Sequence, residues 1–179
     1  MNDYVMGLPK PLAEVSSNLR AQRSRLIDAL SGLASEETVR SPGDDQWNVA
    51  QVVDHLLLAE GFTNDLTKMM ADRASANGEA TGFPDGLEAF DPLPPPRGME
   101  APPPIWPRQE LPAEELICAL EAMAERTEAS LAALASLDPR RYRMDHPLFG
   151  ELDLGQWWML HPMHYEMHIA QAQATLAAG

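Results

Sequence analysis

Long apolar runs are missing from this sequence of 179 residues. No stretch reaches the roughly 18 consecutive apolar residues that a membrane-spanning helix requires, so we expect no membrane partner. The first eight residues lack a basic segment followed by an apolar one, so we expect no signal peptide. Both absences favour a cytoplasmic protein.

Cysteine and basic residues are also scarce. The single cysteine, Cys118, excludes an intrachain disulfide, and a reducing cytosol is the simplest environment for such a chain. Lys and Arg number 13 against 27 Asp and Glu, which gives a formal net charge of −14. Nucleic acids and anionic membranes attract clustered basic residues. The charge balance therefore argues against nucleic acid as a partner.

Convincing strand patterns are missing too, whereas four segments show the apolar spacing of helices. The predicted helices span about residues 8–33, 48–74, 112–137 and 154–178. Two of them open on pairs that resemble capping boxes, Asn48 with Gln51 and Asp153 with Gln156. The third begins near Pro112, a residue type favoured in the first helical turn.

Residues 75–111 differ from the rest of the chain because they contain nine prolines. Proline lacks the amide donor and fixes φ, so this segment predicts a long, partly polyproline crossover. Short links join the first helix to the second and the third to the fourth, so each of these pairs should be antiparallel. The crossover lets the second and third helices run parallel. The sequence thus predicts an all-α fold, a single four-helix bundle over residues 1–179.

Histidines on the second and fourth predicted helices face the core. An α-helix turns about 100° per residue, so His168 lies about 40° from His164, at the centre of an apolar arc. On the second helix the residues within about 60° of His55 are apolar, and they are Leu58, Ala59, Phe62, Leu66 and Met69. Glu60 and Asn64 fall on the far side of that helix.

Three buried imidazoles need a common partner, because an unpaired polar group in an apolar interior costs a few kcal/mol. Neutral imidazole is a good ligand for Zn, Ni, Fe and Cu. His164 and His168 are four residues apart, which places their β-carbons about 5–6 Å apart on one face. With His55 from the facing helix, three rings can reach one ion at about 2.1 Å. The sequence predicts a divalent metal site with open coordination positions, the pattern of catalytic rather than structural sites.

Other polar and sulfur-containing residues have simpler interpretations. A lone inward histidine is more often a hydrogen-bonded core residue than a ligand. We interpret His161 as a packing residue or a support for the ligands, and His146 as a structural loop residue. The methionines of the inner faces, such as Met69, are interpreted as core filler. Cys118 lacks a basic neighbour and is interpreted as a buried thiol rather than a nucleophile.

The histidine-bearing segments resemble a known family. Residues 47–56, WNVAQVVDHL, are similar to the opening motif of the DinB/YfiT-like superfamily. Residues 146–150, HPLFG, residues 156–157, QW, and residues 164–171, HYEMHIAQ, are similar to its closing H-x-x-x-H-x-x-Q region. The resemblance covers most of the chain and leaves the proline-rich crossover unmatched.

This resemblance implies a four-helix bundle of up-down-down-up order with a three-histidine metal site formed by His55, His164 and His168. Members are often dimers, and some relatives are thiol-dependent transferases or isomerases that use bacillithiol, mycothiol or glutathione. The resemblance thus implies a homodimer with zinc or nickel, a small-molecule substrate and a low-molecular-weight thiol. The sequence departs from common members at Met167, where a second histidine often stands, and at Pro162, which is expected to bend the helix just before the site.

Three functions stay open on the sequence alone. The first is a metal-dependent thiol S-transferase or hydrolase, in which a divalent cation lowers the pKa of a bound water or thiol. The second is a non-catalytic metal-binding or stress-response protein. The third is a helical interaction module that pairs through Val53 and Leu57. Contacts to an anionic thiol would come from Arg73, Arg97 and Arg108.

Overall fold

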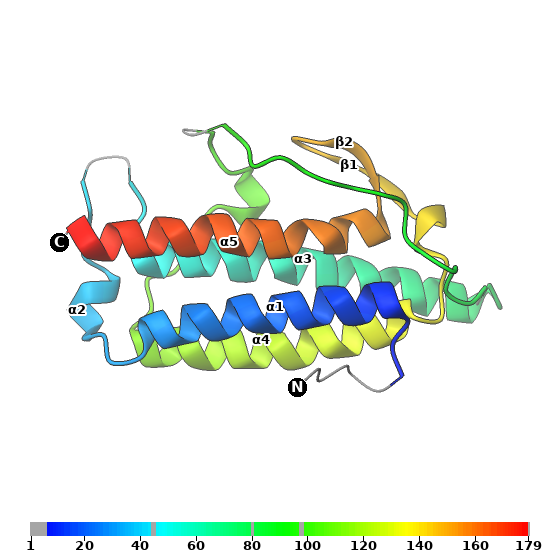
Figure 1. Ribbon diagram of the computed structural model, residues 1–179, viewed down its shortest axis with the longest axis horizontal. Coiled ribbons are helices and arrows are strands. Elements are labelled where there is room, and N and C mark those ends of the chain that lie inside the picture. Colours follow the sequence, from blue (N-terminus) through cyan, green and yellow to red (C-terminus); the bar gives the residue numbers. More distant parts are fainter. Residues whose placement is uncertain (1–6, 44–45, 80, 97–98, 179) are drawn as a thin grey trace.

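Four long helices lie side by side and enclose the core of the protein (Figure 1). They are α1 (Lys10–Leu30), α3 (Val49–Ala76), α4 (Ala113–Leu134) and α5 (Leu154–Ala178). The computed structural model describes residues 7–43, 46–79, 81–96 and 99–178. The predicted helical bundle is confirmed, and the predicted helix ends lie within about three residues of the observed ones.

The helices form a ring in which α1 packs against α4 and α5, and α3 packs against the same two. α1 and α3 are therefore diagonally opposite. The colour gradient in Figure 1 shows that α1 and α5 begin at one end of the bundle, whereas α3 and α4 begin at the other. The crossover returns from the end of α3 along the outside of the bundle to the start of α4.

Leucines from α1 and α4 fill much of the core. Those without any exposed surface are Leu12, Leu19, Leu26 and Leu30 of α1 and Leu116, Leu120, Leu131 and Leu134 of α4. Burying one such side chain contributes about 1.5–3 kcal/mol, which makes this layer the main apolar contribution of both helices. These leucines recur at the helical apolar spacing from which the two helices were predicted.

Capping boxes fix the starts of the two helices that carry the site histidines. The Asn48 Oδ1 accepts from the Gln51 amide at 2.9 Å, and the Asn48 amide donates to Gln51 Oε1 at 3.0 Å. The same exchange joins Asp153 and Gln156 at 2.9 and 3.0 Å. Each cap contributes about 1 kcal/mol and sets the residue at which the helix begins. Both predicted boxes are confirmed.

The prediction that strands are absent was wrong. Antiparallel strands β1 (Arg143–His146) and β2 (Gly150–Asp153) form a hairpin immediately before α5. Each has only four residues, too few to show a clear alternation, and the glycine that begins β2 adopts a φ of +71°. Three short helical turns were also not predicted, namely α2 (Ser35–Thr38), η1 (Pro103–Ile105) and η2 (Pro139–Arg141).

Several residues predicted to be buried are exposed, and the reverse also occurs. Phe62 and Met69 are 46% and 55% exposed, so the face of α3 that carries His55 is not covered along its whole length. Cys118 is exposed, since it lies about 200° around α4 from the buried Leu116. Val53 has no exposed surface, so it is a core residue and not part of an outer dimer seam.

A buried polar network joins all four long helices, and its centre is Glu60. One carboxylate oxygen accepts from Arg23 of α1 at 2.6 Å and from Thr127 of α4 at 2.5 Å. The other accepts from the Tyr165 hydroxyl of α5 at 2.7 Å. Asn64 donates to Thr127 from the next turn of α3. Glu60 and Asn64 do point away from His55, but that side of α3 is core and not solvent.

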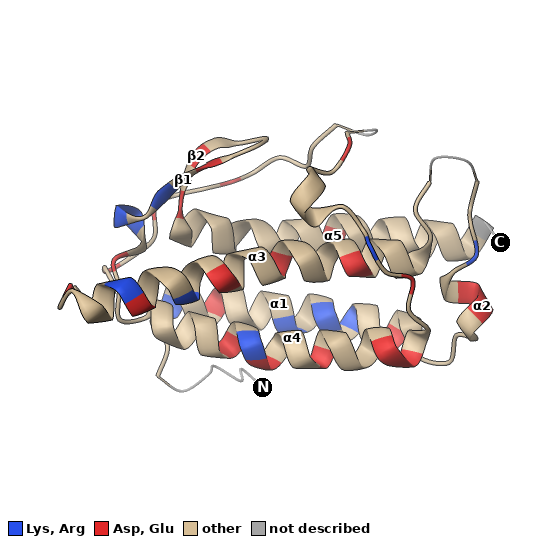
Figure 2. Ribbon diagram, turned by 180° about the vertical axis from the view of Figure 1, so that it is seen from behind, with Lys and Arg blue, Asp and Glu red and all other residues tan. Residues whose placement is uncertain are grey.

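Charge is distributed without a basic face on the described part of the chain. Figure 2 shows acidic residues on most elements, with the fewer basic residues interspersed among them. None of the described helices is both long and apolar enough to cross a lipid bilayer.

Breaking the Glu60 network should destabilise the bundle strongly. Arg23→Met leaves a carboxylate buried without its cation, which typically costs about 3–5 kcal/mol in free energy of unfolding. Arg20→Met makes the same change at a half-exposed position paired with Glu128, and should cost less than about 1 kcal/mol. Urea denaturation of both variants checks this, and equal costs would contradict a central role for the network.

Candidate metal centre

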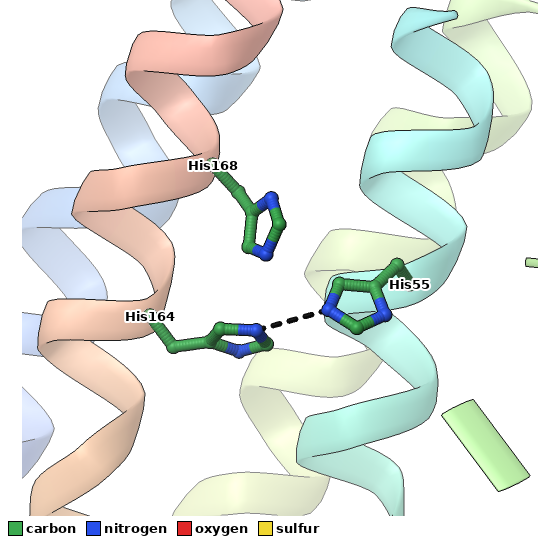
Figure 3. A group of neighbouring side chains, drawn as sticks. All are labelled: His55, His164 and His168. Atoms are coloured by element: carbon green, nitrogen blue, oxygen red, sulfur yellow. Dashed lines mark hydrogen bonds between the residues drawn. The ribbon is translucent and has the colours of Figure 1, made fainter. Parts of the chain in front are cut away.

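His55 of α3 and His164 and His168 of α5 point toward one another between the two helices (Figure 3). The Nε2 atoms of His55 and His164 are 3.0 Å apart. One nitrogen from each of the three rings lies within 4.8 Å of the other two. Two ligands at about 2.1 Å from one ion and at right angles are about 3.0 Å apart, so the spacing of the first pair fits a shared ion.

Hydrogen bonds at the back of two rings select the tautomer that a metal needs. The His55 Nδ1–H donates to the Ile105 carbonyl at 2.8 Å, and the His168 Nδ1–H donates to Gln171 Oε1 at 2.7 Å. A proton on Nδ1 leaves a lone pair on Nε2, which both rings direct to the shared space. Such partners also hold the ring orientation. The donor set thus fits a divalent cation.

Burial keeps the three imidazoles in the neutral, ligating form. Desolvation lowers the pKa of His55, and it lowers the pKa of His168 to about 4 with a further contribution from His55. The pKa of His164 is well below its usual value because the ring is desolvated and lies beside the other two. Near pH 7 none of the three rings therefore carries a second, charging proton.

Two tryptophans cover the histidines on the outer side. The Trp47 ring lies 4.9 Å from that of His55 and stacks at 6.2 Å on that of His168. The Trp106 ring meets Trp47 edge-on at 5.5 Å. His55 and His168 are consequently only 4% and 7% exposed, whereas His164 is half-buried. The covering role of Trp106, on the crossover, was not predicted.

Asp54, immediately before the first histidine, fastens the crossover to α3. Its carboxylate accepts the amide protons of Arg108 and Gln109 at 2.6 and 3.1 Å. No role was predicted for Asp54 from the sequence. The contact was missed because nothing local signals that residues 54 positions further along the chain lie over α3.

The two remaining histidines lie beside the centre rather than in it. His161 is buried, its Nε2 lies 2.9 Å from Thr63 Oγ1, and desolvation lowers its pKa to about 4. His146 accepts the Leu148 amide proton on Nδ1 at 3.1 Å, and its ring packs against Phe149. These contacts support the interpretation of His161 as a packing residue and of His146 as structural, although His146 ends strand β1 rather than lying in a loop.

The arginines proposed for an anionic thiol do not line a common hollow with the histidines. Arg73 lies about 27 Å along α3 from His55 and lines a separate surface hollow with Arg141. Arg108 lines a hollow on the crossover and donates to the Pro104 carbonyl at 3.2 Å. Neither hollow is lined by a histidine. Arg97 lies outside the described residues.

Comparison with known proteins agrees with this architecture. The family model of the DinB superfamily matches residues 18–172, which include α3 and α4 completely and most of α1 and α5. Among curated proteins, none matches the chain. The matched region contains the three converging histidines, both capping boxes and the hairpin that precedes α5. A match over most of its length shows that the protein belongs to the DinB superfamily.

Proposed function

We propose that the protein binds one divalent metal ion through Nε2 of His55, His164 and His168. The observation that carries this proposal is the convergence of three neutral imidazoles from two helices, two of them held by Nδ1 hydrogen bonds in the ligating tautomer. An all-imidazole donor set favours zinc or nickel over magnesium or calcium, which prefer oxygen ligands.

The function that we propose for this centre is metal-dependent transfer of a low-molecular-weight thiol to a small electrophilic substrate, or hydrolysis of such a substrate. When bound, the ion supplies Lewis acidity that lowers the pKa of a coordinated water or thiol. The protein's own residues bind and orient: the imidazoles leave coordination positions open, and Trp47 and Trp106 limit water on the outer side. Asp54 and Glu60 are engaged elsewhere, so neither serves as a general base.

A non-catalytic metal-binding or stress-response role is the second candidate, and the cover over the site favours it. His55 and His168 are almost inaccessible, and neither surface hollow reaches them. A binding protein needs no substrate path, whereas an enzyme must admit its substrate on the side of the half-buried His164.

The proposal also includes the helix order of the bundle that holds the site. We propose the up-down-down-up helix order of the superfamily, which the chain directions in Figure 1 support. A homodimer in the cytoplasm stays a prediction. So does a bend at Pro162, through which α5 continues.

Metal content tests the ligand assignment. The purified protein, loaded with zinc or nickel and desalted, should retain about one ion per chain by elemental analysis. His55→Ala and His168→Ala each remove one of three ligands and should lose most of the ion. His146→Ala is the matched control, since His146 lies outside the centre, and should retain it. Full metal content in both ligand variants would remove the assignment.

The metal-free protein should lose stability as the pH falls from about 6.5 to about 4. His161 titrates near 4 when folded and near 6.5 when unfolded, so in this window the unfolded chain binds more protons and unfolding is favoured. The contribution of His161 to the free energy of unfolding is complete above pH 6.5. Below pH 6.5 it decreases by on the order of 1 kcal/mol per pH unit.

Urea denaturation at several pH values measures this dependence. Surface carboxylates also titrate near the lower end of the window, in the protein and in any variant. The slope of the free energy of unfolding against pH is therefore compared with that of His161→Gln, whose neutral side chain can still bond to Thr63. The variant should lose less stability per pH unit. Identical slopes would mean that His161 does not contribute.

Turnover separates the two candidate functions. Protein loaded with zinc or nickel is assayed with bacillithiol, mycothiol or glutathione and a chloro-aromatic or other electrophile. The enzyme proposal expects thiol consumption that requires the ion and disappears in His55→Ala. A fully loaded protein that stays inactive with every thiol, and that also fails to hydrolyse the electrophiles, would favour the non-catalytic role.

A further inference from the structure

The part of the crossover that lies over the centre, residues 102–109, is a short segment with few amide donors, which we call the strap. Its prolines are Pro102, Pro103, Pro104 and Pro107, so only four residues of the strap have an amide proton. The amides of Ile105 and Trp106 are used within the η1 turn, donating to the carbonyls of Pro102 and Pro103. The two others, of Arg108 and Gln109, both donate to Asp54.

The strap is anchored to α3 at two consecutive residues. Asp54 accepts the two amide protons, and the neighbouring His55 donates from Nδ1 to the Ile105 carbonyl at 2.8 Å. Asp54 is only 7% exposed, so its two hydrogen bonds are shielded from competing water. Hydrogen bonds to a charged group are stronger than those between neutral groups, which makes the carboxylate the stronger of the two anchors.

The position of the strap decides which nitrogen of His55 is free. While the Ile105 carbonyl stays at Nδ1, the proton stays there too and Nε2 carries the lone pair. If the strap leaves, His55 loses this partner and the packing of Trp106 against Trp47, which lies on the His55 ring. Both losses loosen the ring and allow either tautomer.

We propose that Asp54 is a positioning residue of the metal centre, acting through the strap to hold His55 ready for the ion. This inference rests on the proposed metal site and assigns to the strap a closure that is coupled to metal binding. The coupling is reciprocal: a closed strap raises metal affinity, and a bound ion, by fixing His55, favours the closed strap. The strap also covers the site, so the same closure controls access to the ion.

Hydrogen exchange reports the closure directly. The amide protons of Arg108 and Gln109 exchange only when their bonds to Asp54 open. Addition of zinc to the full-length protein should slow exchange across the strap by about tenfold or more, while peptides from the middle of α4 stay unchanged. Unchanged strap exchange in a protein that has bound zinc would overturn the coupling.

Two pairs of variants test the mechanism by zinc affinity, measured by competition with a chromophoric chelator. Asp54→Ala removes the acceptor and should weaken binding by about 10–100-fold, as expected for a partner that orients a ligand. Asp65→Ala changes an exposed aspartate of the same helix, paired with Arg126, and should leave the affinity unchanged.

The second pair keeps α3 intact in case Asp54→Ala does not fold. Gln109→Pro deletes one of the two donated amides, whereas Gln109→Ala shortens the same exposed side chain and keeps the amide. The proline variant should weaken zinc binding several-fold and speed exchange of the strap, and the alanine variant should do neither. Wild-type affinity in the proline variant, with a strap that exchanges faster, would overturn the proposal while leaving the metal site intact. A wild-type protein that binds no zinc would instead refute the metal site itself.

Discussion

Polar side chains buried between α3 and α5 must find partners inside the bundle, and this requirement fixes how the two helices face each other. Three cross-helix pairs follow in antiparallel order along the seam, His55 with His164, Thr63 with His161 and Thr67 with Trp158. Glu60 also bonds across it to Tyr165. A shift of one turn would break every pair and leave several buried polar groups unpaired, at about 1–3 kcal/mol each. The convergence of the site histidines is therefore one consequence of a register that the whole seam determines.

Features that depend on helical phase were predictable from the sequence. The capping pairs beginning at Asn48 and Asp153 set where α3 and α5 start, and about 100° per residue then fixes the direction of each side chain. That is why the inward direction of His55, His164 and His168 followed from spacing alone. Gln171, the last residue of the H-x-x-x-H-x-x-Q motif, bonds to His168.

Features that depend on what lies opposite a helix were not predictable. Glu60 was correctly placed away from His55. That side of α3 is buried because it faces Arg23, Thr127 and Tyr165 on three other helices, which the sequence of α3 does not reveal. Phe62 was correctly placed on the side of His55, yet its side chain is 46% exposed because that part of the face is not fully covered. Periodicity gives the direction of a side chain and not the identity of its surroundings.

The proline content of the crossover, from which only a partly polyproline segment was predicted, explains how the site is covered. An ordinary eight-residue segment lying on a helix would bring eight amide protons to a surface whose backbone is already paired, and each would need a partner. Four prolines halve that number, and the η1 turn satisfies two of the remainder internally. One carboxylate is then enough for the last two. Because that carboxylate belongs to Asp54, two consecutive residues of α3 pair with the strap, and the second of them, His55, is a proposed metal ligand. Covering the site and orienting His55 are therefore a single structural solution.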